Sequence, residues 1–333
     1  MPNDDNIVLA HGESGLATKR LIENVFAPKF SNPILERMED SAIVEIQSKK
    51  LAFTTDGFIV EPIFFTGGDI GKLAASGTIN DLAAMGAKPK YFSASFIIEE
   101  GLKISDLDKI ANSFAETIHR YNSELIAADT KVVPRGTGGG IYIAVSGIGE
   151  VIIDVGLDKI QPYDDIVISG DIARHSAAIL AARENIDTNP ILLSDCAPLW
   201  EIVKLAIDEN IEIHTMRDPT RGGLATVLVE ISEQTNLGMT IDEAKIPIEP
   251  QVKSLCDIYG FDPLYLANEG KMIFIVRNGD GEKLVELLRK NPLSQNAELI
   301  GSVSQQDGVV LKTETGGKRK LIMLEGEQLP RIC

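Results

Sequence analysis

The pattern of strands and helices restarts at a stretch that reads Asp158-Lys159-Ile160-Gln161-Pro162-Tyr163-Asp164-Asp165. The proline at its centre marks a boundary, because proline interrupts both helices and strands. Each side of the stretch mixes the patterns of both element types, and 333 residues exceed the usual size of a single domain. We therefore expect two α/β domains at residues 1–157 and 158–325, followed by a tail at residues 326–333.

Alternating apolar residues predict the strands, and apolar residues at helical spacing predict the helices. In the first half we expect strands at residues 42–47, 51–56, 58–62, 91–98, 124–129 and 141–148, and helices at 70–85 and 105–121. In the second half we expect strands at residues 165–169, 211–217, 272–277, 298–303 and 308–312, and helices at 173–184, 197–209, 221–235 and 281–290. This mixture in both halves indicates an α/β (mixed α+β) fold.

The composition excludes several classes of protein. A net charge of −17 argues against a nucleic-acid or anionic-membrane partner, and no apolar run reaches transmembrane length. The three cysteines, Cys196, Cys256 and Cys333, form no C-x-x-C pair, so a zinc site made by cysteine alone is not expected. The odd cysteine count and the lack of a signal pattern favour reduced thiols in the cytoplasm. We expect Cys196 and Cys256 to be buried structural thiols.

Four aspartates lie where α/β proteins place ligand groups. Asp56 and Asp129 end predicted strands, and Asp218 follows a strand that runs into a helix N-terminus. Asp81 lies on an apolar stripe of the helix predicted at 70–85, where a carboxylate is costly unless it is paired or binds a cation. Together the aspartates are typical of magnesium–nucleotide binding. A turn-forming Asp56 and a hydrogen-bonded structural Asp81 are the alternatives.

Two glycine-rich segments are candidates for phosphate binding. Gly136-Thr137-Gly138-Gly139-Gly140 can turn successive N–H groups toward an anion. No Gly-Lys-Ser/Thr follows it, so it is not a Walker A loop, and a flexible hairpin connection is the alternative. Gly67-Gly68-Asp69-Ile70-Gly71-Lys72 opens a helix and is the second candidate, although Lys72 alone is equally typical of a solvated side chain.

Three further residues are candidates for acid–base chemistry, and one is a candidate for covalent chemistry. Burial beside other charges would tune Lys131 or Glu269, although a surface position is the alternative for both. His175 lies in the first turns of a predicted helix, where a structural histidine is the alternative. Cys333 ends the tail Leu329-Pro330-Arg331-Ile332-Cys333, which can present sulfur to a site, and an incidental surface thiol is the alternative.

Taken together, these motifs resemble the HypE family of hydrogenase maturation factors, within the superfamily of aminoimidazole ribonucleotide synthetase. The resemblance covers nearly the whole chain and rests on Phe53-Thr54-Thr55-Asp56, residues 65–72, Asn80-Asp81-Leu82-Ala83, Met85-Gly86-Ala87-Lys88-Pro89, residues 97–101, 128–133, 136–140, 169–174 and 217–224, and Pro330-Arg331-Ile332-Cys333. The chain departs from the family pattern at His11-Gly12-Glu13-Ser14-Gly15, where Ser14 replaces a glycine that would allow close approach to phosphate.

The resemblance implies a two-domain fold in which the N-terminal sheets of two subunits pair into a barrel across a dimer. ATP would bind in the adjoining cleft, so that residues 1–157 serve both ATP binding and dimerisation. Magnesium and the phosphates would be approached by Asp56, Asp81, Asp129 and Asp218. The nucleotide site would include Gly68, Asp69, Lys72, Thr130, Gly136, Gly138, Gly139, Arg221 and Gly222.

The resemblance also implies a substrate, which is the chain's own Cys333. A carbamoyltransferase, HypF, would place a carboxamide on this thiol. ATP-dependent dehydration would convert it to a thiocyanate, and the cyano group would pass to iron on a HypC–HypD complex. Magnesium would offset charge on the transferring phosphoryl group. Lys131 or Glu269 would take the proton, with His175 as a further candidate.

Two other functions remain open at this point. A related thiamine-monophosphate kinase would not need a terminal cysteine, and a selenophosphate synthetase would carry a reactive cysteine near its N-terminus, which this chain lacks. A non-catalytic scaffold would use the tail only to dock into a partner.

Overall fold

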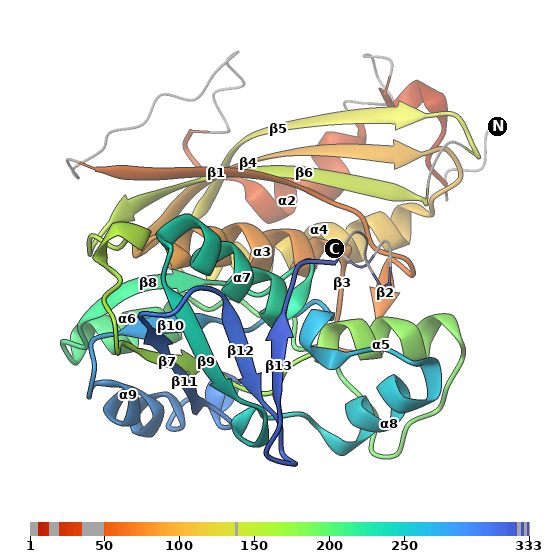
Figure 1. The fold of residues 1–333 in the computed structure, drawn as a ribbon. Coiled ribbons are helices and arrows are strands. Elements are labelled where there is room, and N and C mark those ends of the chain that lie inside the picture. Colours follow the sequence, from red (N-terminus) through yellow and green to blue (C-terminus); the bar gives the residue numbers. More distant parts are fainter. Residues whose placement is uncertain are drawn as a thin grey trace.

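A computed structural model of the chain describes residues 6–12, 20–34, 50–136, 139–324, 328–329 and 332. The strand predicted at 42–47, Ser14, Gly138 and Cys333 lie outside these residues. Two large sheets, each covered by helices, make up the described part (Figure 1). The predicted α/β class is confirmed.

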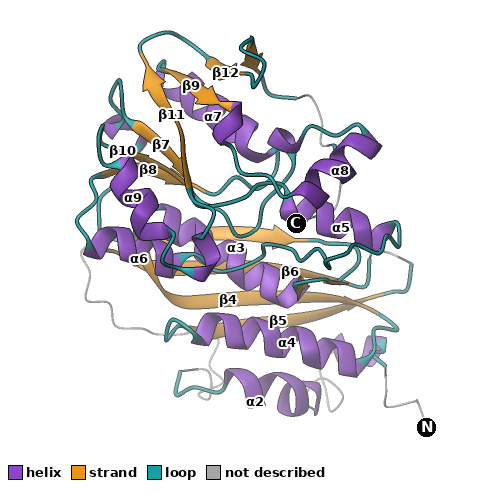
Figure 2. Cartoon of the chain, turned by 90° about the horizontal axis from the view of Figure 1, so that it is seen from below, coloured by secondary structure: helices purple, strands orange, loops and turns teal. Residues whose placement is uncertain are grey.

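The first sheet has the order β1-β6-β4-β5. Its strands are β1 (Leu51–Phe58), β4 (Ala87–Glu99), β5 (Glu124–Val133) and β6 (Ile141–Val151). Only β4 and β5 run parallel. Within the described residues, β1 and β5 form the two edges of this sheet. The helices α3 (Ile70–Ala84) and α4 (Ile104–His119) cover one face of this sheet, and the short α2 (Ala27–Phe30) packs against α4 (Figures 1 and 2).

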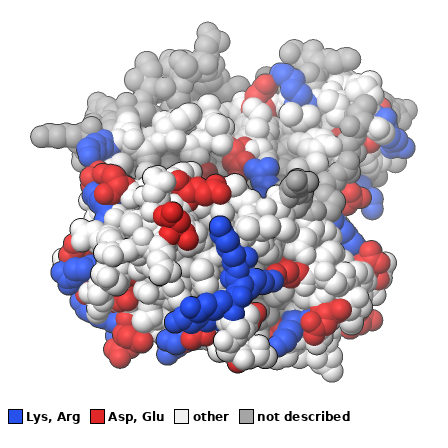
Figure 3. Space-filling view, in the orientation of Figure 1, with Lys and Arg blue, Asp and Glu red and all other residues white. Residues whose placement is uncertain are grey.

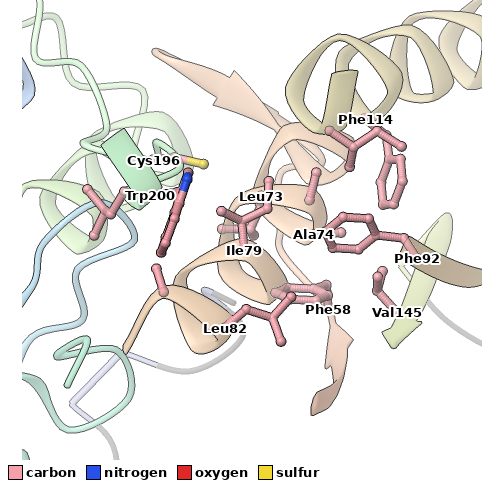
Figure 4. Close-up of a cluster of buried hydrophobic side chains, with 14 of the residues drawn as sticks. Phe58, Leu73, Ala74, Ile79, Leu82, Phe92, Phe114, Val145, Cys196 and Trp200 are labelled. Atoms are coloured by element: carbon pink, nitrogen blue, oxygen red, sulfur yellow. The ribbon is translucent and has the colours of Figure 1, made fainter. Parts of the chain in front are cut away.

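Helix α3 is enclosed from two sides, as its sequence predicts. Phe58, Phe92 and Val145 of the sheet contact one side of it, and Trp200 and Cys196 of the second half of the chain lie on the other (Figure 4). Thirteen of its fifteen residues are buried, which explains why α3 lacks a polar face. A helix held in this way has little freedom to move, so residues on it provide a rigid support for a site.

The second sheet has the order β13-β12-β9-β11-β7-β10-β8. Its strands are β7 (Asp165–Ile168), β8 (Ile213–Arg217), β9 (Gly238–Asp242), β10 (Ile273–Val276), β11 (Glu298–Ser304), β12 (Val309–Lys312) and β13 (Lys318–Leu321). Alternate residues of β10 point to opposite cores: Ile273 and Ile275 pack toward α7 (Gly223–Thr235), whereas Phe274 and Val276 pack toward α6 (Trp200–Asp208) and α9 (Gly281–Leu288). The remaining helices, α5 (Arg174–Arg183) and α8 (Pro250–Tyr259), pack together at one end (Figure 2).

Most predicted elements are present within two or three residues of their expected bounds. The strand expected at 58–62 is wrong: Phe58 closes β1, and the chain then bends so that Ile63 O accepts a hydrogen bond from Ile70 N (3.0 Å). A short hairpin of β2 (Phe64–Phe65) and β3 (Gly68–Asp69) follows instead. Strand β9, helix α8 and the charged strand β13 were not predicted. Within the described residues, no helix combines the length and the apolar character that crossing a membrane requires.

Candidate active site

Three of the four predicted aspartates line one small cavity between the two sheets. Asp56 comes from β1, Asp81 from α3, and Asp218 from the segment between β8 and α7. Glu269 and Arg221 line the same cavity, whose volume is about 30 Å³. This volume is close to that of one water molecule. The cavity therefore has room for a small ion, and a nucleotide base must lie outside it.

Carboxylates outnumber cations in the lining of this cavity. Burial raises the pKa of Asp81, although Thr54 Oγ1 donates a hydrogen bond to its Oδ2 (2.6 Å). Burial and then the nearby charge of Asp81 raise the pKa of Asp218 to about 7. Arg221 is the nearest cation to Asp56, and its Nη2 lies 3.9 Å from Asp56 Oδ1. Carboxylates that resist ionisation in this way are stabilised when a cation enters.

Magnesium is implied by the family resemblance, and the donor set of the cavity suits it. Mg²⁺ prefers one or two carboxylates, several waters and phosphate oxygens to a complete protein cage. Among the described residues, no three His, Cys, Asp or Glu side chains are already arranged to hold a metal ion, so phosphate oxygens and water would have to complete such a site. Asp56, Asp81 and Asp218 are the residues that would hold the ion, and the ion would neutralise charge on the transferring phosphoryl group.

Asp129 does not join the other aspartates within a single chain. Asp56 is in register with Val145, Ala94 and Ala128 across the four strands, so that Asp129 lies at the opposite edge of the sheet. Three strand spacings separate these edges by about 14 Å. One magnesium ion, with ligands at about 2 Å, cannot contact both aspartates.

Thr130 and Lys131 share this edge. Lys131 Nζ donates to Asp129 Oδ1 (3.0 Å), and this hydrogen bond lowers the pKa of Asp129. Asp129 was expected at the end of its strand, and this is wrong: β5 continues to Val133. Asp56 likewise lies two residues before the end of β1. Thr130, Val132 and Val133 favour strand geometry, which extends β5 past the aspartate.

The N-terminus of α3 is capped by its own side chain. Asp69 Oδ1 accepts hydrogen bonds from Gly71 N (2.7 Å) and Lys72 N (3.1 Å). Lys72 Nζ donates to Gly67 O (2.7 Å), which folds its side chain back over Gly68. The first amides of α3 are therefore already satisfied, and a phosphate that binds here must displace Asp69 or approach through Lys72. The roles of Gly68, Asp69 and Lys72 in nucleotide binding stay predictions.

The second glycine-rich segment also holds a carboxylate. Glu99 accepts hydrogen bonds from Gly136 N and from Gly140 N, the latter at 3.1 Å. Gly139 N donates to Tyr142 OH (3.1 Å). An anion at these amides must compete with Glu99, which the sequence alone did not reveal. Gly222, in contrast, has a φ of 75° at the start of α7, where a side chain would collide with Thr226.

The C-terminal tail returns to the protein interior at His175. Ile332 is buried, and its carbonyl oxygen lies 2.5 Å from His175 Nε2. A carbonyl only accepts, so Nε2 carries the proton and Nδ1 accepts from Ser194 Oγ (2.8 Å). The ring of Phe65 packs edge-on against the imidazole. His175 therefore holds the tail one residue before Cys333.

Hydrogen bonds and one peptide link connect the tail to Glu269, which lines the acidic cavity. Ser194, which contacts His175, precedes Asp195, and Asp195 Oδ1 accepts from Glu269 N (3.2 Å). Glu269 is only 2% exposed, and it is the residue that also lines the aspartate cavity. Of the two expected bases, Glu269 thus lies between the tail and the aspartates, whereas Lys131 is exposed at the sheet edge.

A fully buried lysine supports this connection. Lys271 is 1% exposed, and its Nζ lies 3.7 Å from Asp195 Oδ2 and 4.0 Å from Asp171 Oδ1. Its charge compensates carboxylates that would otherwise be costly to bury. Thr54, Ser194, Asp195 and Lys271 were not among the predicted site residues. Thr54 lies in a quoted motif without an expected role, no local motif marks the other three, and the partners of all four lie well away in sequence.

We expect His175 to make stability depend on pH. Burial lowers the pKa of His175 in the folded chain, whereas the unfolded chain keeps the ordinary value of 6.5. Only the unfolded chain then gains a proton on acidification, so the stabilisation is complete above this value and is lost as the pH falls below it. Melting temperatures between about pH 7.5 and about pH 5 should fall more for the unchanged chain than for His175→Gln. The exposed His119→Gln is the matched control, and equal slopes in all three chains would contradict the assignment.

The two remaining cysteines behave as predicted. Cys196 and Cys256 are buried, and burial raises the pKa of both thiols, that of Cys256 to about 11. Such thiols are poor nucleophiles at neutral pH.

The chain is similar to known proteins over nearly its whole length. Residues 38–151 match the N-terminal domain of AIR synthase related proteins, and residues 161–314 match the C-terminal domain. A putative hydrogenase expression/formation protein of Methanocaldococcus jannaschii is 43% identical over 98% of this chain and 99% of its own. Carbamoyl dehydratase HypE of Cupriavidus necator is 42% identical over 98% of this chain and 95% of its own.

Solved structures show the same relationship. The crystal structure of hydrogenase maturation protein HypE in complex with ATP has a TM-score of 0.94 and 40% identity, covering 98% of this chain and 99% of that one. HypE in a HypE–HypF complex has a TM-score of 0.79 and 41% identity, covering 91% of this chain and 99% of that one. Thiamine monophosphate kinase of Aquifex aeolicus, at 21% identity and a TM-score of 0.61, shares the fold alone. The chain therefore belongs to the HypE family of hydrogenase maturation proteins.

Proposed function

We propose that this chain is an ATP-dependent carbamoyl dehydratase that converts a carboxamide on its own Cys333 into a thiocyanate. The observation that carries the proposal is the burial of Ile332 against His175, because it brings the residue before Cys333 to the contacts that lead to Glu269 and the aspartate cavity. A thiamine-monophosphate kinase or a selenophosphate synthetase has no use for such a tail.

The reaction balances through phosphate as the leaving group. The carboxamide oxygen attacks the γ-phosphorus of ATP, ADP leaves, and one nitrogen proton is lost to give an O-phosphorylated imidate. Loss of the second nitrogen proton then expels phosphate and forms the carbon–nitrogen triple bond, so the oxygen leaves within phosphate. Glu269 is the group on this chain that we assign to the nitrogen proton, because it is buried between the tail and the aspartates.

We further propose that the working unit is a homodimer in which β5 of one chain pairs along β1 of the other. Within the described residues both strands are edges of the sheet, and an edge strand can pair with a strand of another chain. The sheet face away from α3 carries small side chains around a groove of about 240 Å³, and Phe53 on that face is 70% exposed. Pairing of β5 with β1 would close two sheets into a barrel and bring Asp129, Thr130 and Lys131 of one chain toward Asp56 of its partner.

The proposal includes partners and a compartment. HypF would place the carboxamide on Cys333, in agreement with the solved complex of a HypE relative with HypF. The cyano group would pass to a HypC–HypD complex for the iron of a nickel–iron hydrogenase. The reaction would take place in the cytoplasm, where a terminal thiol stays reduced.

ATP consumption tests the proposal by its stoichiometry. Because the substrate is the chain's own terminus, chains loaded with the carboxamide should form one ADP each and then stop. Cys333→Ser chains treated identically should form none above background, since no carboxamide can be loaded. Continuous ADP production by Cys333→Ser would instead indicate a kinase with an external substrate.

A further inference from the structure

A basic patch covers the outer face of the ribbon formed by β12 and β13. Lys312 is directly opposite Lys318 in the antiparallel ladder, and Lys320 is two residues further on the same face. All three side chains are exposed, and none forms an ion pair with any residue that the structure describes. Figure 3 shows the patch as a continuous basic area on a chain whose net charge is −17. Like charges in direct opposition are unfavourable, so a partner of opposite charge would relieve a local cost.

Apolar side chains border these lysines. Ile322, Met323 and Leu324 follow β13 directly and are 58%, 43% and 45% exposed. A groove of about 360 Å³ runs between them and the basic ribbon, and its lining includes Tyr265, Lys320, Ile322, Leu324 and Gln328. We call this surface, together with Lys312 and Lys318, the basic groove. The apolar side chains offer contact area and the lysines offer charge, and a protein partner can use both.

The C-terminal tail is anchored at the basic groove. Asp262 N donates to Gln328 Oε1 (2.9 Å), and Gln328 Nε2 donates to Asp262 O (3.1 Å). The carboxylate of Asp262 accepts in turn from Arg319 Nη1 of β13 (2.8 Å). These bonds join the start of the tail to the strand that carries the lysines.

The anchor limits where a second protein can act on the tail. Cys333 is the fifth residue after Gln328, and five fully extended residues span at most about 18 Å. A protein that modifies Cys333 on a withdrawn tail must therefore bring its reactive centre within this distance of the basic groove. Its docking surface on this chain has to be close to the anchor as well.

We propose that the basic groove is the docking surface for the carbamoyltransferase that loads Cys333, and that this partner presents acidic side chains with apolar ones among them. The inference rests on the proposed function, because it takes Cys333 as the acceptor of the carboxamide. Opposite charges would speed the encounter between the two proteins, and the apolar groups would supply contact area. A lysine-rich edge strand also prevents sheets from pairing edge to edge. This simpler role needs only charge at the edge and predicts no effect of the charge's sign on binding to HypF.

Charge reversal separates the two roles. In the triple variant Lys312→Glu, Lys318→Glu and Lys320→Glu, the edge still carries charge but has the wrong sign for an acidic partner. The dissociation constant of the complex with the cognate HypF should rise at least about tenfold at low salt, and its salt dependence should weaken. The matched control carries Lys204→Glu, Lys283→Glu and Lys290→Glu, which make the same change in net charge on α6, α9 and the turn after α9, and it should bind like the unchanged chain.

Two outcomes would overturn the docking proposal. In the first, the triple variant binds HypF as tightly as the unchanged chain does. In the second, the triple variant and its control bind HypF equally weakly. If the triple variant is unfolded by its melting curve, Lys318→Gln with Lys320→Gln replaces it and should weaken binding by a smaller factor in the same direction. When the triple variant is loaded at saturating HypF, it should still convert the carboxamide at the rate of the unchanged chain. If neither the unchanged chain nor any variant converts the carboxamide, the proposed function is contradicted. The measured dissociation constants would still test the docking surface independently.

Discussion

Asp218→Asn is expected to abolish ADP formation by carboxamide-loaded chains, with a loss of at least about 100-fold. Asp218 is one of three aspartates around the cavity that suits magnesium, and metal stabilisation of a transferring phosphoryl group amounts to several kcal/mol. The same substitution should raise the melting temperature of the ATP-free chain. It removes a carboxylate whose pKa is raised to about 7 by burial and by the charge of Asp81, so the folded chain no longer bears that cost.

Single-turnover ADP formation and thermal melting measure these opposite effects on one preparation. Asp242→Asn is the matched control, because Asp242 ends strand β9 and caps a short turn through Ala244 N, away from the cavity. The control should keep its rate. A folded Asp218→Asn chain that forms ADP within about twofold of the unchanged rate would remove Asp218 from the site, since a lost magnesium ligand costs far more than that factor.

A mixed dimer of Asp56→Asn and Lys131→Ala chains should recover about half of the normal activity, although each variant alone is inactive. The expectation follows from the sheet order, which places Asp56 and Lys131 on opposite edge strands that lie about 14 Å apart in one chain. If β5 of one chain lies along β1 of the other, one of the two sites in the mixed dimer carries both substitutions and the other carries neither. Separate affinity tags on the two chains isolate the mixed species for the assay.

The control for this experiment is a mixed dimer of Asp56→Asn with Asp81→Asn. Asp56 and Asp81 line the same cavity of one chain, so each site of this dimer keeps one damaged aspartate and should stay inactive. If each variant alone is inactive and the Asp56→Asn and Lys131→Ala dimer is as inactive as this control, Lys131 acts within its own chain and the proposed strand pairing is wrong.

Local patterns in the sequence were enough to predict the helices that build the site. Helix α3 has apolar or small residues on every side, so its enclosure and the unusual position of Asp81 follow from the sequence. The aspartate after β8 and the glycine-rich opening of α3 were also recognisable, because strand ends and helix N-termini have local signals. The length of β5 was misjudged, because Asp129 interrupts an apolar run that Thr130, Val132 and Val133 then continue.

Contacts between distant segments were beyond such reasoning. His175 and Ile332 are separated by 157 positions, and the sequence around neither residue indicates the other. The same holds for Glu99, whose carboxylate takes the amides of Gly136 and Gly140 that the sequence assigned to phosphate. Lys271 and Asp195 have no motif at all, and only burial identifies them. Tertiary packing decides which of several possible partners a polar group receives, and this choice leaves no periodic trace in the sequence.

Mass spectrometry of the C-terminal peptide tests the central claim most directly. The chain is incubated with its carbamoyltransferase, carbamoyl phosphate and ATP, and the peptide that ends in Cys333 is followed over time, with Cys333→Ser as control. The peptide should first gain a carboxamide and then lose one water in an ATP-dependent step. A carboxamide that forms on Cys333 and never loses water would contradict the assignment of this chain as the dehydratase.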